Sequence, residues 1–351
     1  MRSYVKEILI SVIYWTLVNI FIVTVRFVGV DFFFESRSDM PLFEIYSVSL
    51  PGGLIFGFGW GLIEIIYNRV TSKKRRSFGI VVVSKTLIYS TLFIIIAFLA
   101  SWPGMGSSEM AESYMTSAFT IVNFGLFVMA AFLFVFFKQM NKMFGPGILV
   151  QYLTGKYFIP KEEDRIFMFL DLKSSTSIAE KLSHVLYSKL IQDCFSELTV
   201  PVLDCKGQIY QYVGDEVVIT WKKEDGLNNA NCLNFYYDFI NRLESKKKFF
   251  LRSYKVFPEF KAGLSLGLVT VAEVGELKTE IAYHGDVLNT AARIEGYCIE
   301  FNKPLLASEA LVQELEKNKQ FIFHFIGKVQ LRGKEGISRI YSCEKPTANT
   351  V

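Results

Sequence analysis

The sequence is poor in cysteine and histidine, and this scarcity argues against two common ways of stabilising a fold. Among 351 residues there are five cysteines and three histidines. The cysteines are odd in number, form no CxxC pair and have no histidine at ligand spacing, so neither a disulfide framework nor a zinc site is expected. We predict reduced, mostly buried thiols in a cytosolic domain. The five residues are Cys194, Cys205, Cys232, Cys298 and Cys343.

A large excess of one charge is also missing, and the small net charge of +4 does not indicate a nucleic-acid partner. Residues 1–150 carry 12 Lys/Arg and 8 Asp/Glu, whereas residues 151–351 carry 26 of each, so the excess belongs entirely to the first part. Hydrophobic residues make up 51% of the chain, and mean hydropathy is +0.30. This composition excludes a disordered chain and argues against a wholly water-soluble one.

Four long apolar runs dominate the first part, at residues 8–30, 48–67, 78–102 and 114–137. A helix of roughly 20 apolar residues crosses a bilayer with every backbone polar group paired internally. The first run is too long for a signal peptide and lacks a small-residue cleavage site, which predicts an uncleaved anchor. The sequence has no internal repeat and no matched pair of broken helices, so nothing in it indicates a transport path. We therefore predict a four-helix transmembrane bundle with membrane lipids around it.

The charged residues between the runs predict the orientation. Basic residues gather on one side of the membrane: Arg2, Lys6, Arg69, Lys73, Lys74, Arg75, Arg76, Lys138 and Lys142. The other two loops are acidic apart from Arg37: Asp31, Glu35, Asp39, Glu44, Glu109 and Glu112. The positive-inside rule places both termini in the cytoplasm of a multi-pass protein of the cell (inner) membrane.

Three charges fall inside the apolar runs. Arg26 and Lys85 lie near helix ends, where a long side chain reaches the interface by snorkelling. Glu64 lies in the inner half of its run. Because charges inside a membrane usually face a partner, a further hypothesis is that Glu64 and Lys85 pair between helices.

The chain divides by composition into a membrane domain over 1–137, a cytoplasmic linker over 138–164 and a cytosolic domain over 165–345. Residues 144–147 (FGPG) break the last membrane helix. A short amphipathic piece follows, around residues 148–157. The linker is consistent with either a signal-transmitting segment or a spacer.

The cytosolic part mixes strand and helix patterns. Residues 165–172, 208–213 and 217–221 read as strands, with Gly214-Asp215 as a tight hairpin turn. Ser174, Ser175 and Thr176 are predicted N-cap residues of a helix. Apolar residues at helical spacing continue that helix at Ile178, Leu182, Leu186 and Leu190.

The later elements complete an α+β pattern. Residues 228–248 and 287–301 read as helices, and residues 260–268 and 269–274 as a strand pair. Late strands are expected at residues 321–331 and 338–343, with a turn at 332–334. Helices layered on a mostly antiparallel sheet are the expected arrangement.

Two aspartates carry the first chemical signal. Asp171 ends one predicted strand and Asp215 stands at the hairpin tip, so both acids meet at one sheet edge if the strands are neighbours. Close carboxylates repel unless a cation or proton intervenes. Mg²⁺ binds one or two carboxylates together with substrate phosphates, and two such ions can bridge to a triphosphate. The helix start at Ser174–Thr176 offers N–H groups to phosphate oxygens. Taken alone, an acid at a strand end and a Gly-Asp turn are common structural features.

Asn289 and Arg293 are four residues apart on a predicted helix and therefore share a face. A guanidinium there matches phosphate oxygens through its planar fork. Lys334 stands in a Gly-flanked turn. Taken alone, each of these residues is better explained as a solvated surface residue.

The combination of segments is more specific. The order FLDLKSST, QYVGDEVV, YHGDVLNTAAR and LRGKEG resembles the class III nucleotidyl cyclase catalytic domain, an α+β, ferredoxin-like fold, over about residues 160–345. Four preceding membrane helices are similar to those of the membrane-bound bacterial members. The resemblance implies that Asp171 and Asp215 bind metal, aided by the backbone carbonyl of Leu172. Two Mg²⁺ (or Mn²⁺) ions per active site are implied.

The resemblance also implies that Asn289 and Arg293 are catalytic, orienting the ribose and stabilising the transition-state phosphate, and that Lys334 holds the terminal phosphates. Because family sites form between two domains, it implies a head-to-tail homodimer with two equivalent sites. The implied reaction converts ATP to 3′,5′-cyclic AMP and pyrophosphate.

Two positions depart from the family pattern for the purine. Members commonly place Lys (adenine) or Glu (guanine) where Gln211 stands, and Asp, Thr or Ser where Ala282 stands. Gln can donate and accept hydrogen bonds, whereas Ala can do neither. ATP is favoured on the family's general preference, GTP stays open, and so does a membrane receptor with a degenerate cyclase-like domain. A diguanylate cyclase is disfavoured because VGDEV matches GGDEF only in part.

Overall fold

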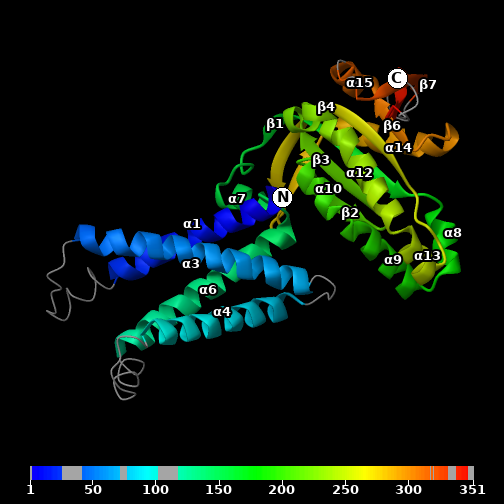
Figure 1. Ribbon diagram of the computed structural model, residues 1–351. Coiled ribbons are helices and arrows are strands. Elements are labelled where there is room, and N and C mark those ends of the chain that lie inside the picture. The colour runs from blue at the N-terminus through cyan, green and yellow to red at the C-terminus, as the bar shows by residue number, and fades with distance from the viewer. Residues whose placement is uncertain are drawn as a thin grey trace. The chain divides into compact units, whose positions relative to one another are not determined.

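The computed structural model describes residues 2–25, 42–71, 77–101, 118–316, 318, 320–330 and 337–346 (Figure 1). The chain forms two compact units, Met1–Phe144 and Gly145–Val351. Several predicted features lie outside the described residues. They are Arg26, the basic stretch 73–76, the acidic loops except Glu44, and the turn that holds Lys334. Glu44, predicted to lie in a loop, belongs to a helix.

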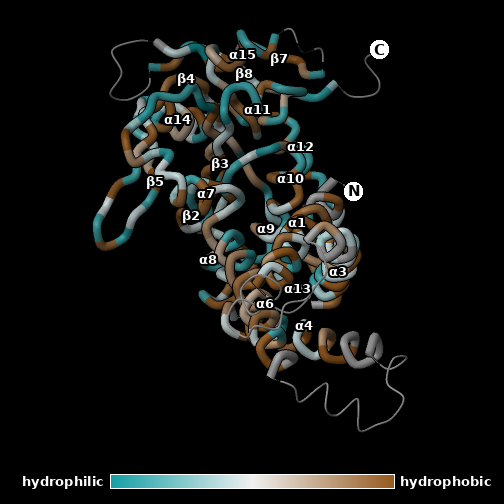
Figure 2. The backbone as a smooth tube through the Cα atoms, turned by 90° about the vertical axis from the view of Figure 1, so that its left-hand side faces the viewer, coloured by the Kyte–Doolittle hydropathy of each residue, from teal (hydrophilic) through white to brown (hydrophobic). Residues whose placement is uncertain are grey.

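The first unit consists, in its described part, of four long helices, which confirms the prediction of four apolar spans. They are α1 (Arg2–Thr24), α3 (Leu42–Thr71), α4 (Phe78–Ser101) and α6 (Ala118–Phe144). Each contains at least 18 residues of mean hydropathy 1.5 to 2.2, which is long and apolar enough to cross a membrane. Apolar and near-neutral colours predominate along these helices in Figure 2, whereas the second unit alternates between polar and apolar segments.

Close backbone contact joins α1 to α3. A Cβ atom at Gly57 would lie 2.5 Å from the Cα of Val12, so only glycine permits this approach. Small residues serve this purpose between membrane helices, where dispersion contacts replace the hydrophobic effect. Aromatic rings then fill the bundle interior, with Trp15 stacked on Phe127 at 5.0 Å between ring centroids.

A buried ion cluster connects α3, α4 and α6. Glu64 is 2% exposed, and its Oε1 lies 2.6 Å from Lys85 Nζ and 3.1 Å from Lys138 Nζ. Tyr89 donates a hydrogen bond to Glu64 Oε2 at 2.5 Å. The predicted Glu64–Lys85 pair is therefore confirmed. The snorkelling explanation of Lys85 is wrong, because its ammonium group finds a carboxylate inside the bundle and the side chain is buried.

Glu64→Leu is expected to destabilise the first unit, because Lys85 then stays buried without a counter-charge. Removing one partner of a buried pair typically costs about 3–5 kcal/mol. The measurement is the melting temperature of the full chain in detergent. Lys142→Met, an exposed position on α6, is the control and should melt like the wild type. Equal melting of Glu64→Leu and wild type would contradict a stabilising role for the cluster.

The second unit is built on one eight-stranded sheet in the order β2-β3-β1-β4-β6-β8-β7, with β5 paired to β4. In the described part β4 and β6 run parallel and the other strand pairs are antiparallel. The mostly antiparallel α+β prediction is confirmed. The strands are β1 (Lys161–Leu172), β2 (Gln208–Val213), β3 (Glu216–Lys222), β4 (Phe260–Val274), β5 (Glu280–His284), β6 (Leu305–Ser308), β7 (Ile322–Gln330) and β8 (Ile337–Glu344).

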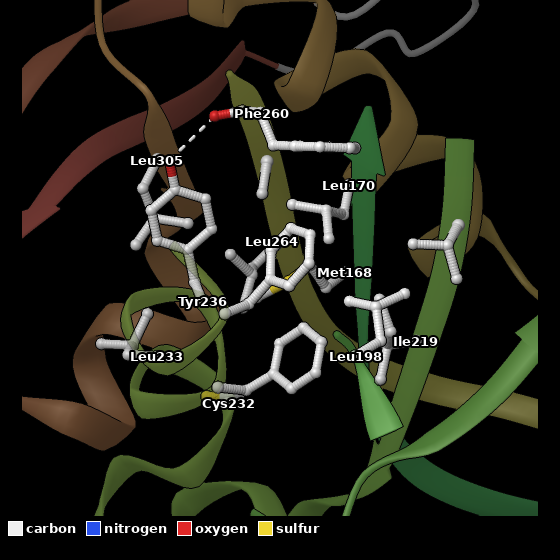
Figure 3. Close-up of a cluster of buried hydrophobic side chains, with 14 of the residues drawn as sticks. Met168, Leu170, Leu198, Ile219, Cys232, Leu233, Tyr236, Phe260, Leu264 and Leu305 are labelled. Atoms are coloured by element: carbon white, nitrogen blue, oxygen red, sulfur yellow. Dashed lines mark hydrogen bonds between the residues drawn. The ribbon is translucent and has the colours of Figure 1, made fainter. Parts of the chain in front are cut away.

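Helices cover both faces of this sheet because alternate strand residues point to opposite sides. Met168 and Leu170 of β1 share a buried cluster with Leu198, just before α10, and with Leu233 and Tyr236 of α12 (Figure 3). Phe167 of β1 packs on the other side with Val287 and Ala291 of α14. The helices of this unit are α7 (Ile148–Leu153), α8 (Ser175–Lys181), α9 (His184–Ser196), α10 (Thr199–Asp204), α11 (Lys223–Leu227), α12 (Asn231–Ser245), α13 (Lys247–Tyr254), α14 (Asp286–Glu300) and α15 (Glu309–Leu315).

Three local predictions are wrong. The helix expected from Ser174 onward is two helices, because Leu182 is extended and Ser183 caps α9 by accepting a hydrogen bond from Leu186 N. Ser174 precedes α8 in a left-handed conformation (φ 56°), and its side chain makes no capping hydrogen bond. The strand pair expected over 260–274 is one continuous strand, β4, which pairs antiparallel with β1 and with the unpredicted β5.

Arg165 is a fully buried cation on β1. Its guanidinium lies 2.8 Å from Glu163 Oε2 and 4.8 Å from the ring centroid of Tyr283 on β5. Burial would raise the pKa of Glu163, but hydrogen bonds from Tyr157 and Lys156, together with the charge of Arg165, lower it to about 2. The cluster ties the chain segment before β1 to the sheet.

Glu163→Gln is expected to flatten the acid limb of the stability curve. The folded-state pKa lies below the ordinary value of 4.5, so the unfolded state takes up more protons between these values and stability falls as pH drops. The contribution is fully present above pH 4.5 and lost toward pH 2. Urea unfolding across this range measures it. Glu162→Gln, an exposed neighbour, should keep the wild-type slope. An identical slope for Glu163→Gln would contradict the assignment.

Candidate active site

The sheet register brings the two predicted aspartates to the same edge. Asp171, the penultimate residue of β1, lies directly opposite Glu216, the first residue of β3. Asp215 immediately precedes Glu216 in the two-residue turn between β2 and β3. Gly214 has a φ of +62°, a conformation that favours glycine, and so closes this tight turn. Asp171 therefore lies beside the hairpin tip that carries Asp215.

A lysine that sequence reasoning missed completes a row across three strands. Glu216, Asp171 and Lys261 occupy directly opposed positions on β3, β1 and β4, so their side chains share one face of the sheet. Lys261 Nζ lies 2.8 Å from Asp171 Oδ2 and also pairs with the carboxylate of Glu295 on α14. The sequence offered one signal for this residue: Lys261 is the charged residue in the otherwise mostly apolar strand FKAGLSLG.

The electrostatics of this edge reflect an excess of negative charge. Burial, followed by the charges of Asp171 and Glu295, raises the pKa of Glu216 to about 7. Burial also raises the pKa of Glu295, although its hydrogen bond with Lys261 opposes the change. Four carboxylates thus gather at this edge, and Lys261 pairs with two of them, Asp171 and Glu295, an arrangement that favours a bound cation.

Tyr187 of α9 is a second neighbour that the sequence did not reveal. Burial, and then the charge and hydrogen-bonding of the nearby Asp215, raise the pKa of its phenol to about 12. The charge of Asp171 acts in the same direction. The phenol therefore stays neutral and lies close to both aspartates.

The residues present suit a divalent cation bound together with phosphate. Asp215 Oδ2 is buried, and the described residues provide no hydrogen-bond partner for it. Over the same residues, no three His, Cys, Asp or Glu side chains form a metal-binding group. Two carboxylates with a backbone oxygen such as that of Leu172 leave coordination positions for phosphate and water, the pattern that Mg²⁺ prefers.

Asn289 and Arg293 share one face of α14, as predicted, but this is not the face that packs on the sheet. Successive helical residues are about 100° apart, which places both opposite to Ala291 and Glu295, the buried positions. Asn289 is exposed and Arg293 half-buried. These two side chains therefore point away from the sheet that carries the aspartates of the same chain.

The remaining predicted residues lie on three other elements. Gln211 is exposed on β2 next to a bulge, and Ala282 lies on β5 opposite Ala272. The rings of Tyr210 and Tyr283, which neighbour these two positions in sequence, contact each other at 4.9 Å between centroids. The segment Ser174–Thr176 begins α8 just after β1.

Comparisons with known proteins agree with this geometry. Residues 160–343, more than half of the chain, match the family described as the adenylate and guanylate cyclase catalytic domain. Adenylate cyclase 2 of Rhizobium meliloti (strain 1021) is 32% identical over 200 residues, covering 57% of this chain and 55% of that protein. An adenylate cyclase of Anabaena cylindrica is 25% identical over 183 residues, covering 50% of this chain and 35% of that protein.

This chain thus spans about half or less of the length of these relatives. Among solved structures, that of a bacterial light-regulated adenylyl cyclase aligns with a TM-score of 0.51 and 21% identity. The alignment covers 59% of this chain and 60% of that one. This likeness shows a shared fold.

Proposed function

Because the chain belongs to the adenylate and guanylate cyclase catalytic domain family, we propose that it is a membrane-bound adenylate cyclase. It converts ATP to 3′,5′-cyclic AMP and pyrophosphate. The observation that carries the proposal is the meeting of Asp171 with the Asp215 hairpin at one sheet edge. The adenylate cyclase relatives support ATP as the substrate.

The aspartates and the Leu172 carbonyl would hold two Mg²⁺ or Mn²⁺ ions, which when bound activate the ribose 3′ oxygen and neutralise the leaving pyrophosphate. Arg293 stabilises the charge that develops on the α-phosphate, and Asn289 orients the ribose. Lys334 binds the terminal phosphates, and backbone N–H groups at Ser174–Thr176 face phosphate oxygens. The protein mainly aligns the nucleotide's own hydroxyl with its α-phosphorus, which is an orientation effect.

A homodimer completes each site. The aspartates lie on one sheet edge, whereas Asn289 and Arg293 project from the opposite side of α14. A head-to-tail partner supplies that pair to the aspartates of the first chain. Two-fold symmetry then generates two equivalent sites.

The catalytic domain is cytoplasmic in this proposal. Four apolar helices precede it, and the distribution of basic residues around them favours both termini on the cytoplasmic side of the cell (inner) membrane. Lipids surround the first unit, and the second unit meets its nucleotide in the cytosol.

Complementation between two inactive variants tests the shared site. Asp215→Asn and Arg293→Ala should each lower cyclic AMP production about 100-fold or more, since each removes a required part. Co-expression should restore about a quarter of wild-type activity, because half of randomly formed dimers are mixed and each mixed dimer has one intact site.

The matched control is Asp215→Asn co-expressed with Asp171→Asn. Both changes affect the same half of the site, so every site stays defective and no activity should return. Persistence of wild-type output in Asp215→Asn alone would refute the metal mechanism. Because such output would still be enzymatic, it would also argue against a degenerate, non-enzymatic domain.

Product analysis with ATP and GTP tests the purine. Cyclic AMP should be the main product, and cyclic GMP as the main species would overturn the choice of ATP. Gln211→Lys should raise the ATP preference and Gln211→Glu should raise the share of cyclic GMP. Changes of several-fold to about tenfold are expected, because one hydrogen bond is worth about 1 kcal/mol. No change in either variant would show that Gln211 does not contact the base.

A further inference from the structure

Lys261 engages one oxygen of a proposed metal ligand. The side chain is 5% exposed, and its Nζ lies 2.8 Å from Asp171 Oδ2. The hydrogen bond that Lys261 donates to this carboxylate is made to Oδ2 and leaves Oδ1 to other ligands. The Asp171 carboxylate thus has one oxygen held from the β4 side and one available on its other side.

Glu295 reaches the same ammonium group from the helix that covers the sheet. A Cβ atom at Gly263 would lie 2.2 Å from the backbone N of Glu295, so the absence of a side chain there lets α14 contact β4 directly. Glu295 is 8% exposed, and a buried carboxylate requires a partner. Lys261 is that partner. Two rigid elements therefore hold the lysine in place.

We propose that Lys261, anchored by Glu295, is a positioning residue that orients the Asp171 carboxylate for a divalent cation. The proposal rests on the function proposed above. Hydrogen bonds from outside the coordination sphere orient ligating side chains, and their loss typically costs about 10–100-fold in metal affinity. Here the ammonium group takes Oδ2 and leaves Oδ1 for the metal.

Glu295 explains how a cation can serve this purpose beside a metal. An isolated ammonium group next to Asp171 would repel a divalent ion. The Lys261–Glu295 pair is neutral, so it orients the carboxylate without adding net positive charge. Glu295→Gln keeps a hydrogen-bond acceptor but removes the negative charge that balances Lys261 beside Asp171, and it should therefore weaken metal binding.

The experiment is a Mn²⁺ titration of the full chain in detergent, without nucleotide, read by the electron paramagnetic resonance signal of free Mn²⁺. Lys261→Met should bind Mn²⁺ about 10–100-fold more weakly than wild type. Lys261→Arg keeps the cation and should recover most of the Mn²⁺ affinity. If Lys261→Arg and Lys261→Met have the same melting temperature, a difference between them in Mn²⁺ affinity cannot come from a merely structural role. The Mn²⁺ affinity of Glu295→Gln should lie between those of Lys261→Met and Lys261→Arg. If Lys261→Met does not fold, Glu295→Gln tests the positioning role in its place.

Lys173→Met is the matched control. It removes the same charge two residues from Asp171, but its ammonium group lies 3.7 Å from Glu259 and contacts neither aspartate. Its Mn²⁺ affinity should match wild type. Unchanged or tighter binding in Lys261→Met and Glu295→Gln would overturn the positioning role and identify Lys261 as a competitor of the metal.

Asp171→Asn separates this inference from the proposed function. If Asp171→Asn binds Mn²⁺ like wild type, the metal site itself is wrong and both proposals fall. If Asp171→Asn loses Mn²⁺ while Lys261→Met and Glu295→Gln retain it, the proposed function stands and only the positioning role is refuted.

Discussion

Repulsion among carboxylates at one edge of the sheet is the constraint around which the second unit is organised. Asp171, Asp215, Glu216 and Glu295 come together from two strands, a turn and a helix, and Lys261 is the cation that the described residues place among them. Burial and these like charges raise the pKa of Glu216 to about 7. Such a site gains free energy when a divalent cation enters. The fold thus maintains a local charge excess that a metal-bound nucleotide can relieve.

The surrounding architecture makes this edge rigid but incomplete. Close packing of α14 on β4 at Gly263 brings Glu295 to Lys261, while the opposite side of the same helix presents Asn289 and Arg293 outward. In the homodimer that we propose, one helix therefore serves two sites: its inner face supports the proposed metal ligands of its own chain, and its outer face suits those of a partner. This division is the physical reason for the dimer that we propose, because one chain cannot direct both faces of α14 at the same nucleotide.

The first unit also buries ionisable groups, here among helices apolar enough to cross a membrane. Glu64, Lys85 and Lys138 would be costly in hydrocarbon as separate charges, and they are placed together between three helices. Close contact at Gly57 and stacked aromatic rings supply the remaining packing. In both units buried ionisable groups lie beside groups of opposite charge from other elements, as Glu64 does beside Lys85 and Lys261 beside Glu295. The cluster in the first unit is closed by its own lysines, whereas in the second unit the described residues provide no hydrogen-bond partner for Asp215 Oδ2.

Hydrophobic period and turn chemistry are properties of neighbouring residues, so the sequence alone was enough to identify several elements. These were the four apolar helices, the strand ending at Asp171, the hairpin that carries Asp215 and the helix with Asn289 and Arg293. The break at Leu182, the continuous strand β4 and the strand β6 were not identified in this way. Lys261, Glu295 and Tyr187 gained their importance only from strand register and helix packing. These contacts join residues up to 90 positions apart, as for Asp171 and Lys261. Only the folded chain decides them, since the free energy of burying a charge depends on which distant group meets it.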